Sequence, residues 1–419
     1  MLNSTRAETP LPSAYRETKI GKLPSSWKVV SLEDVTDPAA PIRYGVVQIG
    51  SDTPDGVPII PIKHIRRIND ATLHRASPDI EAAYAGSRVK GGDVLISVKG
   101  TIGDVGVVPT GFEGNIAREI ARIRPNPSCD ANFLSFQLQA DHTKRRIDSK
   151  VVGSTRLEFS IHAVRDFLIA LPPIHEQRKI AAILRTWDEA IEKLEALRKA
   201  NLQRRIWMRS HLFTGRARLQ GYTGKWREVT LGEVLTEHGL QGTGAEEVFS
   251  VSVHKGLINQ IEHLGRSFAA ADTGHYNRVL PSDIVYTKSP TGDFPLGIIK
   301  QSKISEEVIV SPLYGVFTPA TRALGVILDA LFESPLAVRN YLHPLVQKGA
   351  KNTIAITNRR FLEGKLRLPM DYAEQSAIAD VVEVSQAELT AIEAEIEALT
   401  RQKRGLMQKL LTGEWRVAV

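Results

Sequence analysis

Residues 171–215 read LPPIHEQRKIAAILRTWDEAIEKLEALRKANLQRRIWMRSHLFTG, and the same pattern returns at residues 368–413. Glu176-Gln177 comes back as Glu374-Gln375, 198 residues later, and the closing Leu-Phe-Thr-Gly of the first stretch comes back as Leu-Leu-Thr-Gly at the same offset. A constant offset over so long a stretch indicates an internal duplication.

Each copy has the start and stop signals of a long helix. A proline near Leu171 or Leu368 is followed by about 40 residues without another proline, and a glycine closes each stretch. In the second copy, apolar residues recur at alternating steps of four and three, which is the period of a coiled coil. This seam consists of Ile378, Val382, Leu389, Ile392, Ile396, Leu399, Leu406 and Leu410, with Ser385 and Lys403 in the two remaining positions.

The first copy keeps this register but has a more polar seam. Its members are Ile180, Leu184, Trp187, Ile191, Leu194, Met208 and Leu212, with Arg198, Asn201 and Arg205 in the middle. Polar seam residues lower stability but fix register and partner. Residues 176–213 hold nine basic and five acidic side chains, whereas residues 374–411 hold four and seven. The charges are complementary, so we expect the two helices to pair with each other.

Composition places the chain among soluble globular proteins of two or three domains. It has 419 residues, 42% of them hydrophobic and 24% charged, and no run of 18 apolar residues. The N-terminal sequence lacks the apolar core of a signal peptide, and Cys129 is the only cysteine, so we expect a cytoplasmic protein without disulfides and without a membrane span. A net charge of +7 permits a polyanionic partner but does not identify one.

The duplication also includes the start of a globular part, because the Trp27 segment WKVVSLEDV returns as WREVTLGEV at Trp226. Short runs rich in Val, Ile and Thr predict strands of a compact, irregular sheet, and helices are expected near residues 132–146 and 324–345. The runs are 57–60, 93–97, 105–108, 283–287 and 296–299. We therefore divide the chain into an N-terminal arm (1–19), a globular half (20–170), a helical region (171–215), a second globular half (216–367) and a second helical region (368–419).

The chain shows no signature of catalysis. The phosphate-binding Gly-x-x-x-x-Gly-Lys-Ser/Thr loop is absent, and the glycines near Gly100 and Gly242 do not form a dinucleotide or methyl-donor loop. Eleven histidines lack paired ligand spacing, and a single cysteine builds no zinc site from cysteine pairs. We expect a non-catalytic protein that binds no metal or cofactor itself.

Basic side chains next to turns are the best candidates for a function. Arg and Lys can hold phosphates or pair with guanine, although each of these residues could also be an ordinary solvated side chain. Lys99 and Lys288 are favoured because each follows a matching predicted strand. The DNA-binding candidates are Arg43, Tyr44, Lys63, His64, Arg66, Arg67, Lys99, Thr101 and Arg156 in the first half, and Lys255, His275, Tyr276, Lys288, Ser289, Thr291 and Arg359 in the second.

These motifs resemble the specificity subunits of type I restriction-modification systems, and the resemblance covers nearly the whole chain. It rests on Gly-Lys-Leu-Pro-x-x-Trp ending at Trp27, on Pro-Pro-Ile-x-Glu-Gln-Arg-Lys-Ile-Ala at 172–181, on the second Glu-Gln element at 374–379, and on the paired helix ends. The second copy departs by having Leu-Pro-Met-Asp in place of the double proline.

The resemblance implies an α+β fold: two target recognition domains of irregular mixed sheet, separated by two long antiparallel coiled-coil helices in a pseudo-twofold, cyclic repeat. Each domain would read one part of a split double-stranded DNA site. A helix of about 40 residues is about 60 Å long, enough to hold two reading domains about one duplex turn apart.

The resemblance also implies partners. Two methyltransferase subunits would dock on the helices and bring S-adenosylmethionine, and motor-nuclease (restriction) subunits would join them and use ATP and Mg. The residues assigned to helix pairing and methyltransferase docking are Glu176, Gln177, Ile180, Leu184, Trp187, Ile191, Glu374, Gln375, Ile378, Val382, Leu389, Ile392, Ile396 and Leu399.

Two alternatives stay open from the residues alone. A duplicated coiled-coil adaptor that binds proteins would show no steep salt dependence towards DNA. A fused methyltransferase is opposed by the missing methyl-donor loop. Finally, Glu414-Trp415-Arg416-Val417 follows the second Leu-Leu-Thr-Gly, and we expect it to correspond to the segment that begins at Trp226.

Overall fold

The computed structural model describes residues 15–69, 71–152, 157–261, 273–348 and 354–417. The chain forms two compact units: the first contains residues 1–194 and 395–419, and the second contains residues 195–394. Each long helix therefore belongs partly to one unit and partly to the other, and the domain boundaries from the sequence remain predictions.

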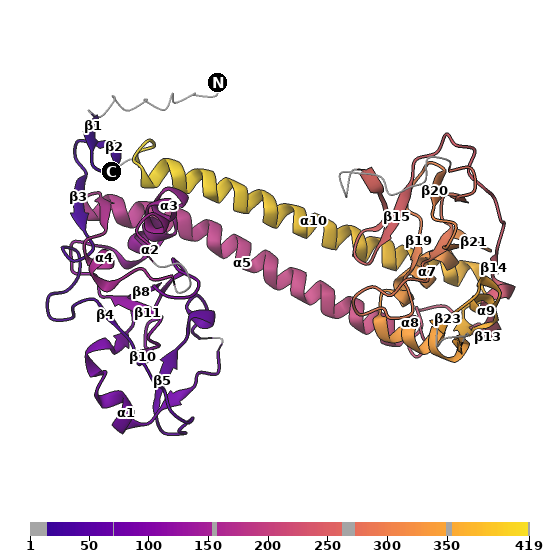
Figure 1. Cartoon of the computed structure of the whole chain (residues 1–419), viewed down its shortest axis with the longest axis horizontal. Coiled ribbons are helices and arrows are strands. Elements are labelled where there is room, and N and C mark those ends of the chain that lie inside the picture. Colours follow the sequence, from indigo (N-terminus) through magenta and orange to yellow (C-terminus); the bar gives the residue numbers. More distant parts are fainter. Residues whose placement is uncertain (1–14, 70, 153–156, 262–272, 349–353, 418–419) are drawn as a thin grey trace. The chain divides into compact units, whose positions relative to one another are not determined.

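The first unit is built on two four-stranded sheets (Figure 1). One is antiparallel, in the order β4-β11-β8-β9, and the other, β6-β5-β10-β7, contains the parallel pair β5–β10. The strands are β4 (Arg43–Tyr44), β5 (Val57–Ile60), β6 (Arg75–Ala76), β7 (Val89–Lys90), β8 (Val94–Ser97), β9 (Val105–Val107), β10 (Glu113–Ile116) and β11 (Ile120–Ile123).

Successive side chains of a strand point to opposite faces of its sheet, so β8 contributes to two separate hydrophobic cores. Val94 and Ile96 of β8 face a cluster with Leu134, whereas Leu95 faces a second cluster with Ile60 and Ile116. The helices of this unit are α1 (Pro78–Ala82), α2 (Ala131–Gln139), α3 (Asp141–Asp148) and α4 (Ile161–Arg165), with short 3-10 turns η1 (Ile62–His64) and η2 (Ala85–Ser87). The helix expected near residues 132–146 is thus two helices, because Ala140 between them has an extended ψ of 140°.

The second unit repeats the first sheet. Its antiparallel order β14-β21-β18-β19 matches β4-β11-β8-β9 strand for strand. The strands are β14 (Leu235–Thr236), β18 (Ile284–Tyr286), β19 (Ile299–Gln301) and β21 (Gly315–Pro319). The strand predicted at 296–299 begins only at Ile299, because Gly297 has a φ of 105° and a Cβ there would lie 1.8 Å from the Thr287 carbonyl oxygen.

The rest of the second unit differs from the first. Two-stranded pairs take the place of the second sheet: β15 (Phe249–Ser252) with β16 (Gly256–Asn259), β17 (Asn277–Val279) with β20 (Val308–Val310), and β22 (Gln347–Lys348) with β23 (Ile354–Ala355). The helices are α7 (Arg322–Phe332), α8 (Pro335–Leu342) and α9 (Asn358–Glu363), with 3-10 turns η3 (Leu231–Glu233) and η4 (His343–Leu345). A common scaffold therefore carries two divergent surfaces.

A small antiparallel ribbon leads into each long helix. β3 (Lys28–Ser31) pairs with β12 (Leu168–Leu171) in the first unit, and β13 (Arg227–Thr230) pairs with β24 (Lys365–Leu368) in the second. In each ribbon the second strand comes directly before the proline that starts the helix.

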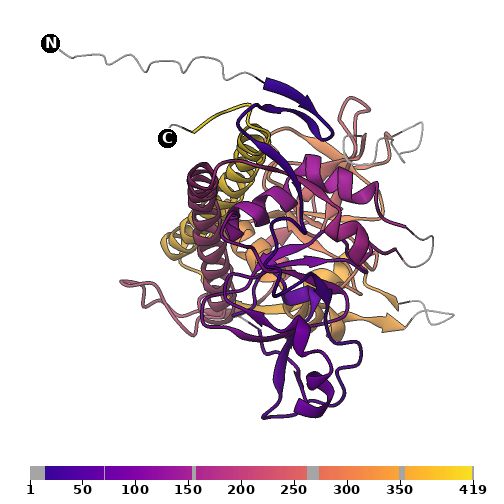
Figure 2. The same cartoon turned by 90° about the vertical axis from the view of Figure 1, so that its left-hand side faces the viewer.

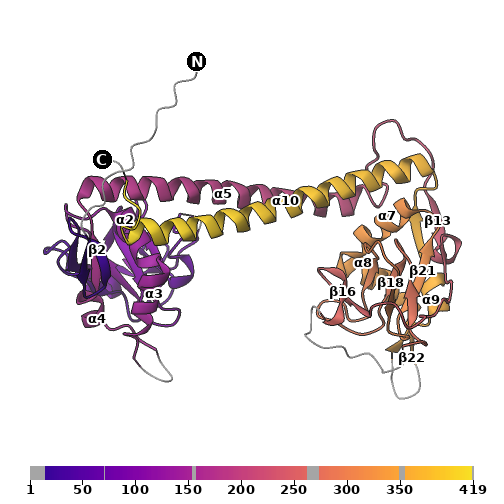
Figure 3. The same cartoon turned by 90° about the horizontal axis from the view of Figure 1, so that it is seen from above.

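The long helices are α5 (Ile174–His211) and α10 (Tyr372–Leu411), seen from above in Figure 3. In the second unit Arg198 Nε lies 2.9 Å from Glu393 Oε1, and Arg204 pairs with Glu388 further along, so the helices run antiparallel. In the first unit Asp188 pairs with Lys403. The α+β fold with two long helices is confirmed, and the complementary charges form the expected pairs.

Residues 15–19 differ from the expected arm, because β1 (Tyr15–Thr18) forms a hairpin with β2 (Gly21–Pro24), whereas residues 1–14 of that arm lie outside the described residues. The Tyr15 hydroxyl donates a hydrogen bond of 2.8 Å to the Gly413 carbonyl oxygen, so the hairpin lies beside the end of α10 (Figure 2). This distant contact could not be anticipated from the polar, proline-bearing sequence.

Candidate nucleic-acid interface

Tyr44 and Lys99, which the sequence suggested separately, lie together in the first unit. The Lys99 ammonium is 4.7 Å from the centre of the Tyr44 ring and 3.4 Å from Glu158 Oε1. The Tyr44 hydroxyl donates a hydrogen bond of 2.6 Å to the same oxygen. We call these three residues the Lys99 cluster. Glu158 was missed because a lone acidic residue in a loop carries no sequence signal.

The Lys99 cluster has coupled electrostatics. Burial, together with the hydrogen bond to Glu158, raises the pKa of Tyr44 to about 12. The hydrogen bond from Tyr44, aided by the charge of Lys99, lowers the pKa of Glu158. The tyrosine therefore stays neutral and the glutamate ionised at neutral pH, so the carboxylate holds the lysine at the end of β8.

We expect Tyr44→Phe to raise the pKa of Glu158 towards its ordinary value, because the largest stabilising contact of the carboxylate is lost. The carboxyl carbon of Glu158 can be followed by NMR as pH is lowered. Tyr84→Phe is the control, since Tyr84 is a half-buried tyrosine elsewhere in the same unit. An unchanged Glu158 titration in Tyr44→Phe would contradict the cluster.

The second basic segment of the first unit lies against the turn between β8 and β9. Arg66 Nη2 is 2.6 Å from Asp104 Oδ1, and a Cβ on Gly106 would lie 1.8 Å from the Ile65 carbonyl oxygen. Lys63, Arg66 and Arg67 are exposed and His64 is half-buried, while Thr101 is exposed in the adjacent turn. Arg43 is also exposed, on β4. Arg156 lies outside the described residues.

Lys288 occupies the matching place in the second unit, just after β18, and is exposed. Desolvation lowers its pKa, and the nearby Glu237 carboxylate opposes this effect. Glu237 in turn accepts a hydrogen bond of 2.5 Å from Asn358 Nδ2, next to the exposed Arg359. Both units thus place a lysine near a carboxylate at the same strand end, although different elements supply the carboxylate.

The remaining candidates of the second unit are more scattered. Lys255 is exposed in the turn between β15 and β16, and Ser289 and Thr291 are exposed beyond Lys288. His275 is exposed and meets the ring of Tyr276 edge-on at 5.2 Å, but Tyr276 is buried and forms part of the interior. Among the described residues, no hydrogen bond or ion pair joins Lys255 or His275 to Lys288.

The Glu-Gln elements of the two helices are buried inside the chain. Glu176 accepts a 3.1 Å hydrogen bond from Trp27 Nε1 and pairs with Arg416 at 2.7 Å. In the second unit Glu374 accepts a 3.2 Å hydrogen bond from Trp226 Nε1 and pairs with Arg218 at 2.6 Å. We call these the Glu-Trp-Arg clusters.

The Glu-Trp-Arg clusters correct one sequence correspondence. Arg416 occupies the place of Arg218, 198 residues earlier, so Trp415 matches Ala217 and not Trp226. Consistently, Trp415 is 56% exposed whereas Trp226 is 6% exposed. Shared Trp-Arg letters suggested the wrong alignment, and the constant offset gives the right one.

Gln177 and Gln375 hold the backbone that leads into each helix. Gln177 Nε2 donates a 2.8 Å hydrogen bond to the Pro172 carbonyl, and Gln375 Nε2 does the same to the Pro369 carbonyl. Because both Glu-Gln pairs are used internally and buried, they present no surface to a docking partner.

The apolar seam also faces inward. Ile180, Leu184, Ile378, Leu389 and Ile392 are buried, and Trp187, Ile191, Val382, Ile396 and Leu399 are half-buried. Sequence reasoning missed exposed apolar side chains on α5 in the second unit. They are Leu197 (48%), Leu202 (39%), Ile206 (49%) and Trp207 (50%), of which Leu202 and Ile206 lie one turn apart on the same side of the helix.

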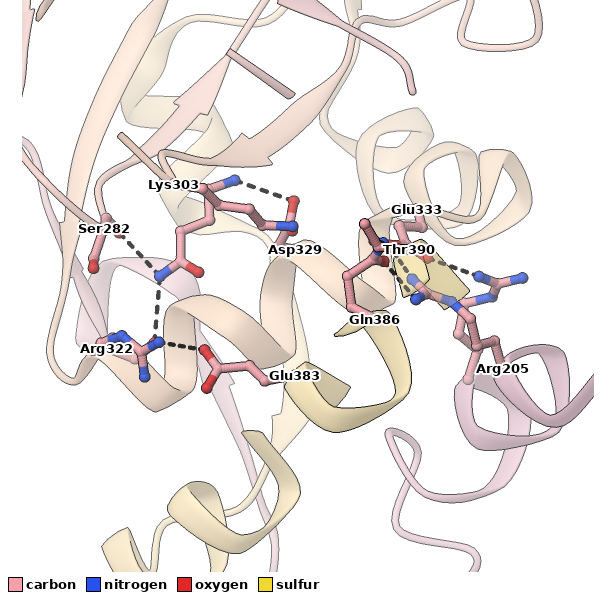
Figure 4. Close-up of polar contacts among 11 residues, drawn as sticks. Arg205, Ser282, Lys303, Arg322, Asp329, Glu333, Glu383, Gln386 and Thr390 are labelled. Carbon is pink, nitrogen blue, oxygen red and sulfur yellow. Dashed lines mark hydrogen bonds and ion pairs between the residues drawn. The ribbon is translucent and has the colours of Figure 1, made fainter. Parts of the chain in front are cut away.

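The polar seam residues of the second unit join the helices to the globular part (Figure 4). Arg205 lies 2.6 Å from Glu333 Oε1 and donates a hydrogen bond of 2.5 Å to Gln386, and Arg209 shares Glu333 at 2.9 Å. On the neighbouring part of α10, Glu383 pairs with Arg322. These contacts satisfy a buried cation that would otherwise be costly.

No group of three or more His, Cys, Asp or Glu side chains in the described part of the chain could hold a metal ion. No helix there is both long and apolar enough to cross a membrane.

Comparison with known proteins finds one family to which this chain is similar. Residues 24–204 match the family model described as the type I restriction modification DNA specificity domain. The specificity subunit of the EcoBI type I restriction enzyme of Escherichia coli is 29% identical over 164 residues, which are 38% of this chain and 34% of that protein. The chain thus spans about a third of that relative's length.

A second relative matches over nearly its whole length. The putative MjaX type I specificity subunit of Methanocaldococcus jannaschii is 24% identical, with 96% of this chain and 97% of that protein covered. Among solved structures, the type I S subunit of M. genitalium superposes with a TM-score of 0.59 at 16% identity, covering 92% of this chain and 96% of the other. With the duplicated fold and the matched motifs, the chain is thus similar to the specificity subunits of type I restriction-modification systems.

Proposed function

We propose that this chain reads a bipartite double-stranded DNA site, with one unit reading each part. The observation that carries the proposal is the repeated four-stranded sheet, which presents Lys99 or Lys288 at the same strand end within otherwise divergent surroundings. Two different half-sites require two different reading surfaces, and a repeated scaffold with divergent loops provides them. Phosphate contacts would position each unit, and the divergent loops would select bases.

We further propose that the chain acts without catalysis of its own. Two methyltransferase subunits would supply S-adenosylmethionine, and restriction subunits would supply ATP and Mg chemistry. Because the heptad seam is turned inward, the exposed face of α5 that carries Leu202 and Ile206, one turn apart, is the better place for a partner helix. Docking on this face would leave the seam and the Glu-Trp-Arg clusters undisturbed.

We expect Lys99→Ala to weaken binding of cognate DNA by about tenfold through the first half-site, and Lys288→Ala to do the same through the second. Each change should also reduce the slope of log affinity against log salt by about one, as loss of a phosphate contact does. Fluorescence anisotropy over a range of salt concentrations, with either half-site scrambled in turn, measures both quantities.

Matched controls are Lys28→Ala in the first unit and Lys365→Ala in the second. Both lysines are exposed and lie on the ribbons β3–β12 and β13–β24, away from the sheet ends. Equal affinities for the wild type and both Lys99→Ala and Lys288→Ala would remove these loops from the interface. DNA affinity that does not depend on salt would favour the protein-adaptor alternative instead.

The function itself is tested by expressing this chain with its methyltransferase partner and mapping methylated adenines across the host genome. We expect one motif with two specific parts and an unspecified gap. Exchange of residues 20–170 for the matching region of a relative should change one part of the motif only. A continuous motif, or methylation that does not need this chain, would refute the proposal.

A further inference from the structure

Arg122, on β11 of the first unit, is a buried cation without an acidic partner. It is 2% exposed, and its guanidinium donates hydrogen bonds of 3.0 and 2.8 Å to the carbonyl oxygens of Arg88 and Pro41. Its Nε has no partner, and no carboxylate of the described residues lies within ion-pair distance of it. A buried charge left unpaired is costly, so its presence calls for an explanation.

The carboxylates that act on the Arg122 charge are Asp93 and Asp37, and neither lies within ion-pair distance of it. Asp93 accepts two hydrogen bonds of 2.7 Å from Arg124. Glu81 is held by Arg88, with Nε at 2.8 Å from Oε1. Arg122 therefore has no ion pair of its own within the described part of the chain. Burial together with Arg124 lowers its pKa, and the carboxylates of Asp93 and Asp37 oppose this effect.

A second cation lies directly beside it. Arg43 on β4 is the cross-strand partner of Arg122, so the two side chains leave the sheet on the same face. Like charges directly opposite each other destabilise a sheet. Arg43 makes no ion pair with the described residues, and its Nη1 fills the space beside Gly86, 2.8 Å from where a Cβ would lie.

A cavity of about 630 Å³ opens at this point between the two four-stranded sheets. Its wall combines Arg88, Lys90, Arg122 and Arg124 with the small residues Gly56, Gly86 and Gly114, and Glu113 is its one acidic side chain. Lys90 and Glu113 are cross-strand partners on β7 and β10. Arg88 and Arg124 pair with Glu81 and Asp93, and Lys90 lies opposite Glu113. Arg122 is therefore the cationic side chain of this wall that has no acidic counterpart among the described residues.

The second unit shows that the scaffold itself does not need this charge. Arg122 lies opposite Leu95 of β8, and the residue in the same register of the repeat is Val316, opposite Val285 and buried in an apolar cluster. By contrast, the neighbouring Arg124 has a counterpart in Thr318, which donates a 2.7 Å hydrogen bond to Asp283 as Arg124 does to Asp93. Arg124 therefore belongs to the repeated framework, and Arg122 is an addition peculiar to the first unit.

We propose that the cavity beside Arg122 is a phosphate-binding site of the first unit. A phosphate group supplies the missing negative charge, and its oxygens accept the hydrogen bonds that guanidinium and ammonium groups donate. Two sources share this chemistry: a backbone phosphate of bound DNA, and a free phosphorylated small molecule. The first source deepens the proposed function and rests on it, whereas the second is independent of it.

The first arm of the test uses the full chain without DNA and inorganic phosphate as the probe. Thermal unfolding is compared in phosphate and in chloride at equal ionic strength. We expect phosphate to raise the melting temperature of the wild type, Arg122→Met to abolish the rise, and Arg122→Lys to keep part of it. Lys90→Ala, an exposed change at the rim, should reduce the rise even where Arg122→Met fails to fold, and Lys28→Ala is the control.

The second arm measures DNA affinity against salt concentration for the same variants. A slope reduced by about one in Arg122→Met or Lys90→Ala, with phosphate competing for DNA, identifies the source as a DNA phosphate. Phosphate stabilisation with an unchanged slope identifies a free phosphorylated molecule. The site is refuted when phosphate stabilises no more than chloride and the slope of Lys90→Ala equals that of Lys28→Ala. A wild type that binds no DNA would refute the proposed function, while the first arm would still decide on the site.

Discussion

Glu176→Ala is expected to lower the free energy of unfolding of the first unit by about 3–5 kcal/mol, the usual cost of removing one partner of a buried ion pair. Glu176 is fully buried, and its carboxylate is bound by both Trp27 Nε1 and the Arg416 guanidinium. Without it, both donors lose their acceptor and the side chain leaves a void. Glu374→Ala should have the same effect in the second unit, where Trp226 and Arg218 take the equivalent places.

Urea unfolding gives the size of this loss, and hydrogen exchange assigns it to one unit. The control is Glu189→Ala on the same helix, because the Glu189 side chain is 58% exposed and its pair with Arg185 is worth about 0.5 kcal/mol or less. Arg416→Ala should reproduce part of the Glu176→Ala effect. A loss below about 1 kcal/mol for both Glu176→Ala and Glu374→Ala would show that the clusters are not stabilising elements.

The long helices of this fold are predictable from the sequence, whereas the exact starts and partners of its short strands are not. The heptads and the constant offset predict α5 and α10 because about 40 residues of one period outweigh local exceptions. The start of β19 was misplaced because the conformation of Gly297 depends on the Thr287 carbonyl, which is a tertiary contact. The β1–β2 hairpin was missed for the same reason, since Tyr15 is held by Gly413.

Individual residues of the candidate interface were predictable only where the two halves of the repeat could be compared. Lys99 and Lys288 stood out because they follow matching strands, and the structure places each near a carboxylate. Tyr276 was chosen for its chemistry but is buried, because sequence does not show which face of an irregular segment turns inward. Arg122 escaped notice because it lies within a strand, where a basic residue normally signals an exposed face.

Adding one heptad to α5 and one to α10 at matched points is expected to lengthen the unspecified gap of the DNA target by about three base pairs. Seven residues add about 10 Å of helix, and a base pair occupies about 3.4 Å. Matched insertion keeps Arg198 with Glu393 in the second unit and Asp188 with Lys403 in the first, provided the new residues lie between these pairs. The reading surfaces are unchanged, so both specific parts of the motif should stay the same.

Methylation mapping in a host that expresses the lengthened chain with its methyltransferase partner measures the gap. The matched control adds five residues to each helix, which rotates the apolar seam beyond the insertion by about 140°, turns it away from its partner and should abolish methylation. Insertion into α5 alone should also fail, since it moves Asp188 two turns out of step with Lys403. If the lengthened chain kept the original gap, the helices would not set the spacing, because the reading units would then be placed on DNA by contacts that do not depend on helix length.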